Sequence, residues 1–271
     1  MATYNGGRFL TMQLDSIMGQ TYQDWHLYVH DDGSSDETTE ILQKYEQEHH
    51  KDISILHYPP QGGSCSNFLS LLERVDAKYY MFADQDDIWH IKKIEKSMVI
   101  MHKMEQIHPD IPIIIHSDLR IIDEHQTTLH NSFFQYSNIH PEQIVRYEEY
   151  IQNIVTGSTM LFNHHAKTCA FSKPFTHATM HDAWVTLRAI AEGGMRYTIY
   201  EPLTDYRQHR NNVMGALNGR RFTLRYRLVH AKEMIHMNIA HYRMMNSAGS
   251  ISLYTFLKNK YKFFIHNRGN K

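Results

Sequence analysis

The chain has 271 residues, of which 42% are hydrophobic, and a formal net charge of −1. This length allows one large α/β domain, or one domain with a small appendage, and a sizeable buried core. The two cysteines, Cys65 and Cys169, fit no Cys-x-x-Cys motif and no disulfide framework, which indicates a reducing compartment. Because the sequence also lacks an 18-residue apolar run and a signal-peptide pattern, we expect a cytoplasmic protein that neither spans a membrane nor is exported.

The small net charge conceals two regions of opposite sign. Residues 216–271 carry 11 Lys and Arg and one acid, Glu233, whereas residues 1–215 carry 17 Lys and Arg and 28 Asp and Glu. A basic tail suits nucleic acid, an anionic membrane face or solubility, and the acidic remainder makes nucleic acid the least suitable partner. The 21 histidines do not predict a zinc site, because no His-Glu-x-x-His motif and no Cys/His quartet accompany them.

Hydrophobic spacing predicts helices and strands that alternate through the first 120 residues. The expected elements are a helix over 8–18, a strand over 25–30, a helix from about 36 to 49, a strand over 53–58, a helix over 66–75, a strand over 79–83 and a helix over 91–107. This order is typical of βαβ units, so the sequence predicts an α/β fold with a mostly parallel sheet flanked by helices.

After Pro112 the rhythm changes. We expect two short strands over 113–118 and 119–122, a segment without clear periodicity over 128–150, a loop leading into a strand over 156–162, and a helix over 182–191 that ends at Gly193 and Gly194. The segment 128–150 is interpreted as an insertion on the acceptor side of the site.

The basic tail has two amphipathic segments, which predict a C-terminal helical extension. The first segment places apolar residues on one stripe: Leu224, Leu228, Ala231, Ile235 and Ile239. The second places Tyr254, Leu257, Tyr261, Phe264 and Ile265 on one face, interleaved with Lys258, Lys260 and Lys262. Such a mixture of apolar and basic residues suits peripheral contact with an anionic membrane, and packing onto the main domain is the alternative.

Three acidic residues, Asp84, Asp86 and Asp87, follow the predicted strand 79–83 directly. Loops after such strands are where open α/β sheets hold ligands, and Mg²⁺ or Mn²⁺ takes carboxylate oxygens together with substrate phosphates. The run therefore indicates a metal-bound diphosphate, with a solvated acidic turn as the alternative. Asp87 has a further alternative as the cap of a helix that begins near Ile88.

Two earlier residues fit the base of a nucleotide. Tyr4 offers a flat stacking partner and Asp32 an acceptor for the edge of the base, and both are expected at the ends of strands. The alternatives are an aromatic residue at the edge of the core for Tyr4 and a turn-forming residue in Asp-Gly-Ser for Asp32.

Five stretches, in the same order, resemble the inverting nucleotide-sugar-dependent glycosyltransferases of family two, and more closely the rhamnosyltransferase-like members. They are Met-Ala-Thr-Tyr-Asn-Gly at 1–6, Asp-Asp-Gly-Ser-Ser-Asp at 31–36, Asp-Gln-Asp-Asp at 84–87, His-Asp-Ala-Trp at 181–184, and Tyr-Arg-Gln-His at 206–209 with Asn-Asn-Val at 211–213. The resemblance covers about residues 1–215 and implies a GT-A (Rossmann-like) catalytic domain there, followed by the basic helical tail at 216–271.

The resemblance also implies roles for single residues. It places Thr3, Tyr4 and Asp32 in the base pocket, Asp84 at the ribose or the water shell of the metal, and Asp86 on Mg²⁺ or Mn²⁺. It implies that Arg207 and His209 close over the diphosphate, as a cation and as a metal ligand or phosphate donor, and that Asp118, Gly157 and Ser158 lie near the donor sugar and the acceptor. As alternatives, Gly157 permits a turn and Asp118 sits in a β-bend.

Asp182 matches the general base of the family, which removes the proton of the acceptor hydroxyl. A helix N-cap is its alternative. Since a single displacement inverts the anomeric centre, no nucleophilic residue and no covalent intermediate are expected.

The activity that the resemblance implies is transfer of a sugar, with L-rhamnose as the named candidate, from dTDP-rhamnose or a UDP-sugar to a glycan or lipid-linked acceptor at the inner face of the membrane. Family members begin with several apolar residues before the Thr-Tyr-Asn step, whereas this chain starts at Met1, so most of the first strand is missing. A catalytically impaired nucleotide-sugar-binding module, left by the truncated strand, is therefore one rival hypothesis. A membrane-surface scaffold, in which the basic tail is the functional part, is the other.

Overall fold

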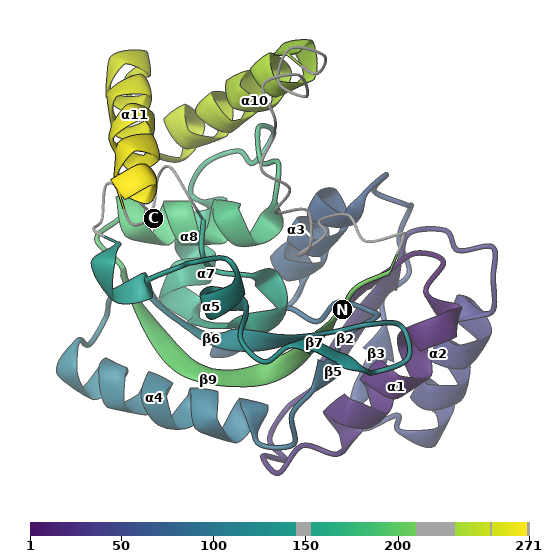
Figure 1. The fold of residues 1–271 in the computed structure, drawn as a ribbon. Helices are drawn as coiled ribbons and strands as arrows, with labels where there is room; N and C mark the ends of the chain where they lie inside the picture. The colour runs from purple at the N-terminus through teal and green to yellow at the C-terminus, as the bar shows by residue number, and fades with distance from the viewer. Residues whose placement is uncertain (145–152, 210–230, 250, 270–271) are drawn as a thin grey trace.

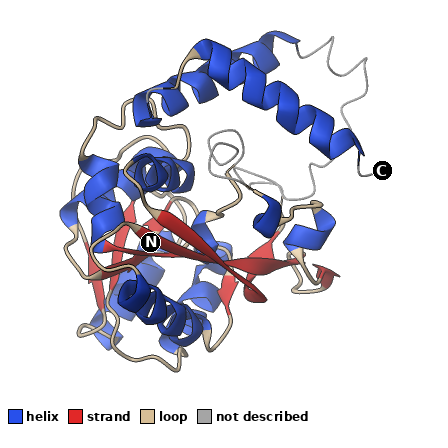
Figure 2. Ribbon diagram, turned by 90° about the vertical axis from the view of Figure 1, so that its left-hand side faces the viewer, coloured by secondary structure: helices blue, strands red, loops and turns tan. Residues whose placement is uncertain are grey.

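The computed structural model describes residues 1–144, 153–209, 231–249 and 251–269, and side chains are not described for 231, 233, 234 and 263–269. Helices lie on both sides of a central layer of strands, and the two C-terminal helices sit together beyond one helical layer (Figures 1 and 2). The expected α/β architecture is therefore present.

The described strands are β1 (Ala2–Thr3), β2 (Leu27–Asp31), β3 (Ile53–Ile55), β4 (Tyr79–Met81), β5 (Ile88–Trp89), β6 (Ile113–Ile122), β7 (Thr128–His130), β8 (Met160–Asn163) and β9 (Met195–Arg207). The described α-helices are α1 (Gly7–Met18), α2 (Thr38–Glu48), α3 (Ser64–Arg74), α4 (Lys93–Ile107), α5 (Phe133–Tyr136), α7 (His164–Phe171), α8 (His181–Ala191), α10 (Ala231–Gly249) and α11 (Leu253–Gly269). Short 3-10 turns occupy Pro141–Gln143 and Gly157–Thr159.

The first three strands form a parallel sheet in the order β1-β2-β3, with Thr3 paired to Asp31 and Val29 paired to Ile55. Helices α1 and α2 supply the crossovers between these strands, as the alternating sequence pattern predicts. Although β1 has only two residues, the backbone N–H of His30 donates to the carbonyl of Met1 at 3.1 Å and extends the pairing. The carboxyl ends of β1 and β2 consequently lie side by side.

The remaining strands form a mixed sheet in the order β4-β8-β6-β9-β5, with β7 paired to β6. Parallel pairing in this sheet is between β6 and β9, whereas β4 and β6 run antiparallel to β8 and β5 runs antiparallel to β9. Residues 113–122 form one continuous strand instead of the two expected. The pairing of β6 with β9 shifts register at Asp118, so the strand continues past the predicted break. Strand β9 and helix α7 were not predicted.

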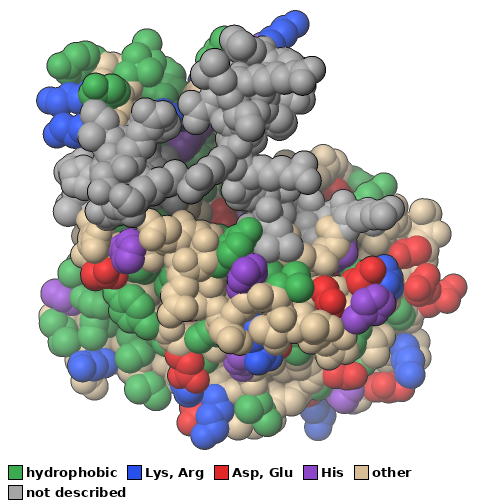
Figure 3. Space-filling model, in the orientation of Figure 1, with side chains coloured by type: hydrophobic (Ala, Val, Ile, Leu, Met, Phe, Trp, Pro, Cys, Tyr) green, Lys and Arg blue, Asp and Glu red, His purple; other side chains and the backbone are tan. Residues whose placement is uncertain are grey.

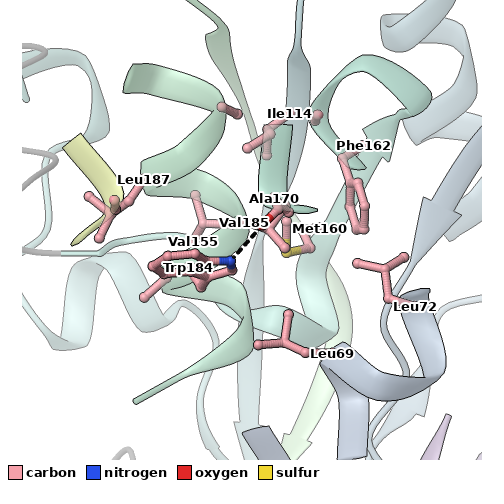
Figure 4. Packing of buried hydrophobic residues seen from close by; sticks show 14 of the residues in the cluster. Leu69, Leu72, Ile114, Val155, Met160, Phe162, Ala170, Trp184, Val185 and Leu187 are labelled. Carbon is pink, nitrogen blue, oxygen red and sulfur yellow. Dashed lines mark hydrogen bonds between the residues drawn. The ribbon is translucent and has the colours of Figure 1, made fainter. Parts of the chain in front are cut away.

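Side chains along the mixed sheet point alternately to its two faces, and this divides the hydrophobic core into two layers. Ile114 of β6 faces a cluster with α3, α7 and α8, while its neighbours Ile113 and Ile115 face a cluster with α1 and α4. Trp184 of α8 is fully buried in the first cluster, and its indole N–H donates to the carbonyl of Ala170 at 2.9 Å (Figure 4). Alternation with period two is what a strand covered on both faces requires.

Helix α10 packs on α8 through residues other than those predicted. Met244, Met245 and Ala248 are buried in the cluster around Trp184, whereas Ile235 and Ile239 of the predicted stripe are exposed. Leu224 and Leu228 lie outside the described residues. Packing onto the main domain, the alternative for this segment, therefore occurs by a different face of the helix.

Helix α11 buries Phe256 and Asn259 and exposes Tyr254, Leu257 and Tyr261. The side chains of Phe264 and Ile265 are outside the described set. Within the described part of the chain, no helix has the length and apolar character needed to cross a membrane.

Candidate functional site

The loops after β1 and β2 bring the predicted base-pocket residues to one end of the parallel sheet. The Tyr4 side chain is 58% exposed, as a stacking surface requires, and the N–H of Asp32 donates to the carbonyl of Thr3 at 2.8 Å. Thr3 itself is buried and its hydroxyl donates to Asp31 Oδ1 at 2.9 Å. Thr3 is therefore buried beneath this loop, while Tyr4 lies exposed on it.

The Asp32 carboxylate is already occupied by backbone donors. It accepts from the N–H groups of Gly63 at 2.8 Å and Gly62 at 3.3 Å, and also from Gln61. Both glycines have positive φ, 76° for Gly62 and 149° for Gly63, which lets successive N–H groups point at one carboxylate. Asp32 thus holds the loop that leads into α3, in addition to any contact with a base.

The acidic run lies between β4 and β5. Burial, together with the negative charges of Asp86 and Asp182, raises the pKa of Asp84 to about 7. Asp87 is fully buried, and burial together with Asp86 and Asp84 raises the pKa of its carboxyl well above the ordinary value. Its Oδ1 accepts from the N–H of Arg207 at 3.2 Å, and a strand follows it, so it does not cap a helix.

Asp86 and His209 meet beside this loop, and both side chains are largely buried. Their Oδ2 and Nε2 atoms are 2.7 Å apart, and the His209 ring packs beside Phe9. Adjacent ligands of an octahedral Mg²⁺ with bonds of about 2.1 Å are roughly 3 Å apart, so a small opening lets both atoms face one ion. No cluster of three His, Cys, Asp or Glu ligands occurs among the described residues. A two-residue site fits because Mg²⁺ usually keeps waters and takes substrate phosphates beside one or two carboxylates.

Arg207 is placed differently from the expectation. The side chain is fully buried, and its guanidinium donates to the backbone carbonyls of Asp86, Asp123 and Glu124 while lying over the Phe9 ring. In this arrangement the guanidinium faces backbone carbonyls and the Phe9 ring, so the predicted contact with a diphosphate stays a prediction. Its role in this structure is to fix the backbone of the acidic loop from behind.

Asp182 lies in the first turn of α8, 6% exposed. Its Oδ2 accepts from the N–H of Gly157 at 2.9 Å and its Oδ1 accepts from the N–H of Ala183. Burial raises the pKa of this carboxyl to about 6, although both hydrogen bonds oppose the rise. A Cβ on Gly157 would lie 2.6 Å from Nε2 of His181, so space, as well as the predicted turn, requires glycine there.

Lys93 was not predicted. It is 1% exposed, and its ammonium donates to Thr204 Oγ1 at 2.9 Å and to the carbonyl of Ser158, over the Trp89 ring. Burial lowers the pKa of Lys93, and the charges of Asp87 and Asp84 oppose that change. One sequence feature could have identified this residue: Lys93 stands at the start of a predicted helix, six residues after the acidic run and directly before Ile94.

Two residues expected near the sugar have structural partners. Asp118 is buried and accepts from the N–H groups of Phe133 and Phe134, both at 3.1 Å, and from the Ser132 hydroxyl, so it holds the start of α5. It sits at the register shift in β6, in line with the predicted bend. Ser158 is buried and contributes its carbonyl to Lys93. Neither side chain reaches the surface of the site.

Comparison with known proteins gives a family. The model of the Glycosyl transferase family 2 matches residues 1–166. The dTDP-rhamnosyl transferase RfbG of Shigella flexneri is 27% identical over 230 residues, which cover 80% of this chain and 74% of that protein. TuaG of Bacillus subtilis, named as a teichuronic acid biosynthesis glycosyltransferase, is 24% identical over 211 residues and 78% of each chain. The UDP-Glc:alpha-D-GlcNAc-diphosphoundecaprenol beta-1,3-glucosyltransferase WfgD of Escherichia coli is 22% identical over 69% of this chain and 67% of its own length.

Solved structures share the fold. TarS 1–349 of S. aureus in complex with UDP has a TM-score of 0.61 at 12% identity, over 97% of this chain and 69% of that one. Against a longer TarS chain the match covers 36% of that chain. The mannosyltransferase PcManGT of Pyrobaculum calidifontis, in complex with GDP-Man and Mn²⁺, has a TM-score of 0.58 at 14% identity, over 100% of this chain and 74% of that one. The predicted GT-A type of α/β fold is confirmed.

Proposed function

Since this chain belongs to glycosyl transferase family 2, we propose that it transfers a sugar from a nucleoside-diphosphate donor to a glycan or lipid-linked acceptor by an inverting single displacement. The observation that carries the proposal is the buried Asp182 carboxylate, fixed by two backbone N–H groups and close enough to Asp84 to raise its pKa. The catalytic domain in this proposal is residues 1–215, with residues 216–271 as a basic helical tail.

Asp182 acts as the general base. The N–H groups of Gly157 and Ala183 hold the carboxylate in one orientation, so that a free lone pair can accept the proton of an acceptor hydroxyl. A pKa of about 6 leaves the group mainly ionised at pH 7, yet makes it a stronger base than an ordinary aspartate. The acceptor oxygen then attacks the anomeric carbon, and the diphosphate leaves with the electron pair of the broken bond.

Asp86 and His209 would hold a divalent ion, Mg²⁺ or Mn²⁺, with Asp84 at the ribose or among the waters of the ion. When bound, such an ion supplies positive charge that stabilises a departing diphosphate. Burial raises the pKa values of Asp84 and Asp87, and the negative charge of Asp86 adds to both rises, as the charge of Asp182 does for Asp84. A cation bound here would favour the ionised form of these carboxyl groups.

For the donor we propose dTDP-rhamnose first and a UDP-sugar second. RfbG is named as a dTDP-rhamnosyl transferase, and WfgD is named for a UDP-Glc donor and an acceptor on diphosphoundecaprenol. Both names support a nucleotide-sugar donor, and the name of WfgD supports a lipid-linked carbohydrate acceptor. Thr3, Tyr4 and Asp32 would surround the base.

Peripheral contact with an anionic membrane is part of the proposal. The exposed face of α11 presents Tyr254, Leu257 and Tyr261 together with Lys258 and Lys262. Hydrophobic and basic side chains gather there, at the upper left of Figure 3. Aromatic and lysine side chains on one helix face suit the headgroup region of anionic lipids, where a lipid-linked acceptor would be presented.

The deciding experiment is an assay of sugar transfer and hydrolysis with dTDP-rhamnose and UDP-sugars, in Mn²⁺ and in EDTA. We expect turnover with one donor in Mn²⁺, loss of turnover in EDTA, and loss of metal-stimulated nucleoside-diphosphate binding in Asp86→Ala. Binding without turnover by any acceptor would favour the catalytically impaired module. Absence of nucleotide binding, together with vesicle binding, would favour the membrane-surface scaffold.

A further inference from the structure

Gln85, between Asp84 and Asp86, directs its side-chain amide to the loop that follows β1. Its Oε1 accepts from the N–H of Tyr4 at 2.8 Å, and its Nε2 donates to the carbonyl of Tyr4 at 3.0 Å. One side chain thus pairs with both polar groups of one residue, as a neighbouring strand would. The two residues are 81 positions apart in the chain.

The loop that receives Gln85 is held by side chains at four successive backbone N–H groups. The pairs are Tyr4 with Gln85 Oε1, Asn5 with Ser34 Oγ, Gly6 with Thr38 Oγ1 and Gly7 with Asp36 Oδ2, at 2.8, 2.8, 2.9 and 3.0 Å. Three of these acceptors come from the segment after β2, in the same parallel sheet. Gln85 is the acceptor that comes from the acidic loop.

Gly6 is shaped to receive the Gln85 amide. A Cβ built on Gly6 would overlap the Cδ and Oε1 atoms of Gln85, and it would lie 2.8 Å from Nε2. The φ of Gly6 is −107°, which any residue adopts, so the absence of a side chain serves contact and not backbone conformation. The amide therefore lies flat against the Gly6 backbone.

This contact joins two parts of the fold that the described strand pairings leave separate. Strand β1 belongs to the parallel sheet and β4 to the mixed sheet, and the pairings among the described strands contain no ladder between them. We call residues 4–7, which follow β1, the nucleoside loop, and residues 84–87, which follow β4, the acidic loop. The spacing between the two loops must match the spacing between the base and the diphosphate of a donor.

We propose that Gln85 is a positioning residue that couples the nucleoside loop at Tyr4 to the metal and diphosphate loop at Asp86. The inference rests on the proposed function, since it assumes that a nucleoside diphosphate spans both loops. Loss of the two hydrogen bonds lets the loops move independently, so the free energy gained by binding the nucleoside no longer fixes the diphosphate end.

The first test measures Kd for UDP and dTDP by titration calorimetry in Mn²⁺ and in EDTA. We expect Gln85→Ala to weaken the tighter nucleotide roughly 5- to 50-fold in Mn²⁺, as loss of two hydrogen bonds predicts. Gln85→Glu keeps an acceptor for the Tyr4 N–H but sets an oxygen against the Tyr4 carbonyl, so we expect a similar loss. The donor KM should rise by more than kcat falls.

The second test is a double-mutant cycle with Gly6→Ala, which displaces the Gln85 amide without altering Gln85 itself. We expect Gly6→Ala to weaken nucleotide binding strongly in the wild-type background and at most twofold in the Gln85→Ala background, because the overlapping side chain is then gone. Equal effects of Gly6→Ala in both backgrounds would overturn the contact on which the inference depends.

Gln43→Ala, which removes an exposed glutamine from α2, is the matched control and should bind nucleotide like the wild type. Thermal unfolding without ligand checks that each variant folds. If wild-type protein binds neither UDP nor dTDP, the proposed function fails. If the wild type binds one of them and folded Gln85→Ala binds it equally well, the inference about Gln85 is wrong.

Discussion

Asp182 allows the mechanism to be tested at a single atom. Replacing Asp182 by Asn removes the basic oxygen but leaves a side chain of the same shape, with one oxygen to accept from a backbone N–H. We expect turnover to fall about 10²- to 10⁴-fold, the typical contribution of a positioned general base. Binding of UDP or dTDP should change less than threefold, because the base acts on the acceptor. The check is steady-state kinetics beside calorimetry, and a variant with wild-type turnover would remove Asp182 from its role.

The pH dependence of kcat/KM provides a second test of the same residue. A general base works only when it is deprotonated, so the rate should fall on the acid side of its pKa. With the pKa of Asp182 raised to about 6 by burial, we expect kcat/KM to drop about tenfold per pH unit below 6. An acid limb near pH 4, the range of an ordinary aspartate, would contradict the burial of this carboxyl.

His181, next to the base, predicts acid sensitivity of the fold. Its ring is 4% exposed and stacks on Phe68, with centroids 4.1 Å apart, and burial lowers its pKa to about 3. An unfolded histidine titrates near 6.5, so the unfolded chain binds the extra proton first as pH falls. Stability from the neutral ring is therefore complete above about pH 6.5 and is lost progressively toward pH 3.

The free energy of unfolding should fall in both proteins when the pH is lowered from 7.5 to 4.5. We expect this fall to be ~2 kcal/mol smaller in His181→Leu than in the wild type. Urea unfolding at both pH values measures this difference. The exposed His125→Leu is the control and should follow the wild type. An identical acid loss in wild type and His181→Leu would show that the ring does not stay neutral in the fold.

Sequence patterns predicted site roles for the acidic run, Asp182 and His209 because their chemistry is visible in residue type and order. They missed Lys93 and Gln85, whose importance lies in contacts with Ser158 and Tyr4, 65 and 81 positions away. They also did not reveal the surroundings of Arg207, because a motif does not show whether a guanidinium faces solvent or, as here, backbone carbonyls.

At the scale of elements, local periodicity predicted the helices of the first half well and failed for β9. That strand contains Pro202 and two exposed residues, Tyr200 and Glu201, so it does not alternate. Its pairing with β6 tolerates this because the register shifts between Ser117 and Asp118. Such a strand is recognised from its partner, and that information is absent from a short sequence window.

The docking of α10 on α8 depends on Arg188. This residue is 1% exposed, and its guanidinium donates to the carbonyls of Ala248 and Cys169 and to Glu192. Arg188→Ala would remove the guanidinium donor from the carbonyl of Ala248 and leave a cavity beneath α10, so we expect a loss of roughly 2–4 kcal/mol in the free energy of unfolding. Urea unfolding measures the loss, and the exposed Lys103→Ala is the control. A loss below 0.5 kcal/mol would mean that α10 is not anchored by this contact.

For the whole molecule, the division of charge matters more than the net value of −1. The acidic site belongs to the N-terminal part, which would be repelled by an anionic lipid surface, whereas the basic residues gather in the tail. Such a division of charge favours contact with an anionic surface through the basic tail rather than through the acidic part of the chain.

The proposed membrane contact predicts that the exposed face of α11 determines binding to anionic vesicles. Each lysine near an anionic surface contributes about 1 kcal/mol, and partial burial of aromatic and leucine side chains adds to this. We expect the triple variant Tyr254→Ser, Leu257→Ser and Tyr261→Ser to bind vesicles containing anionic phospholipid at least tenfold more weakly than the wild type, measured by cosedimentation.

The control is Val99→Ser, at an exposed apolar position on α4, which should bind vesicles like the wild type. Because these positions are exposed, activity toward a water-soluble acceptor should be unchanged, which separates a membrane contact from a fold defect. Equal vesicle binding by the triple variant would place the membrane contact elsewhere on the chain or remove it from the proposal.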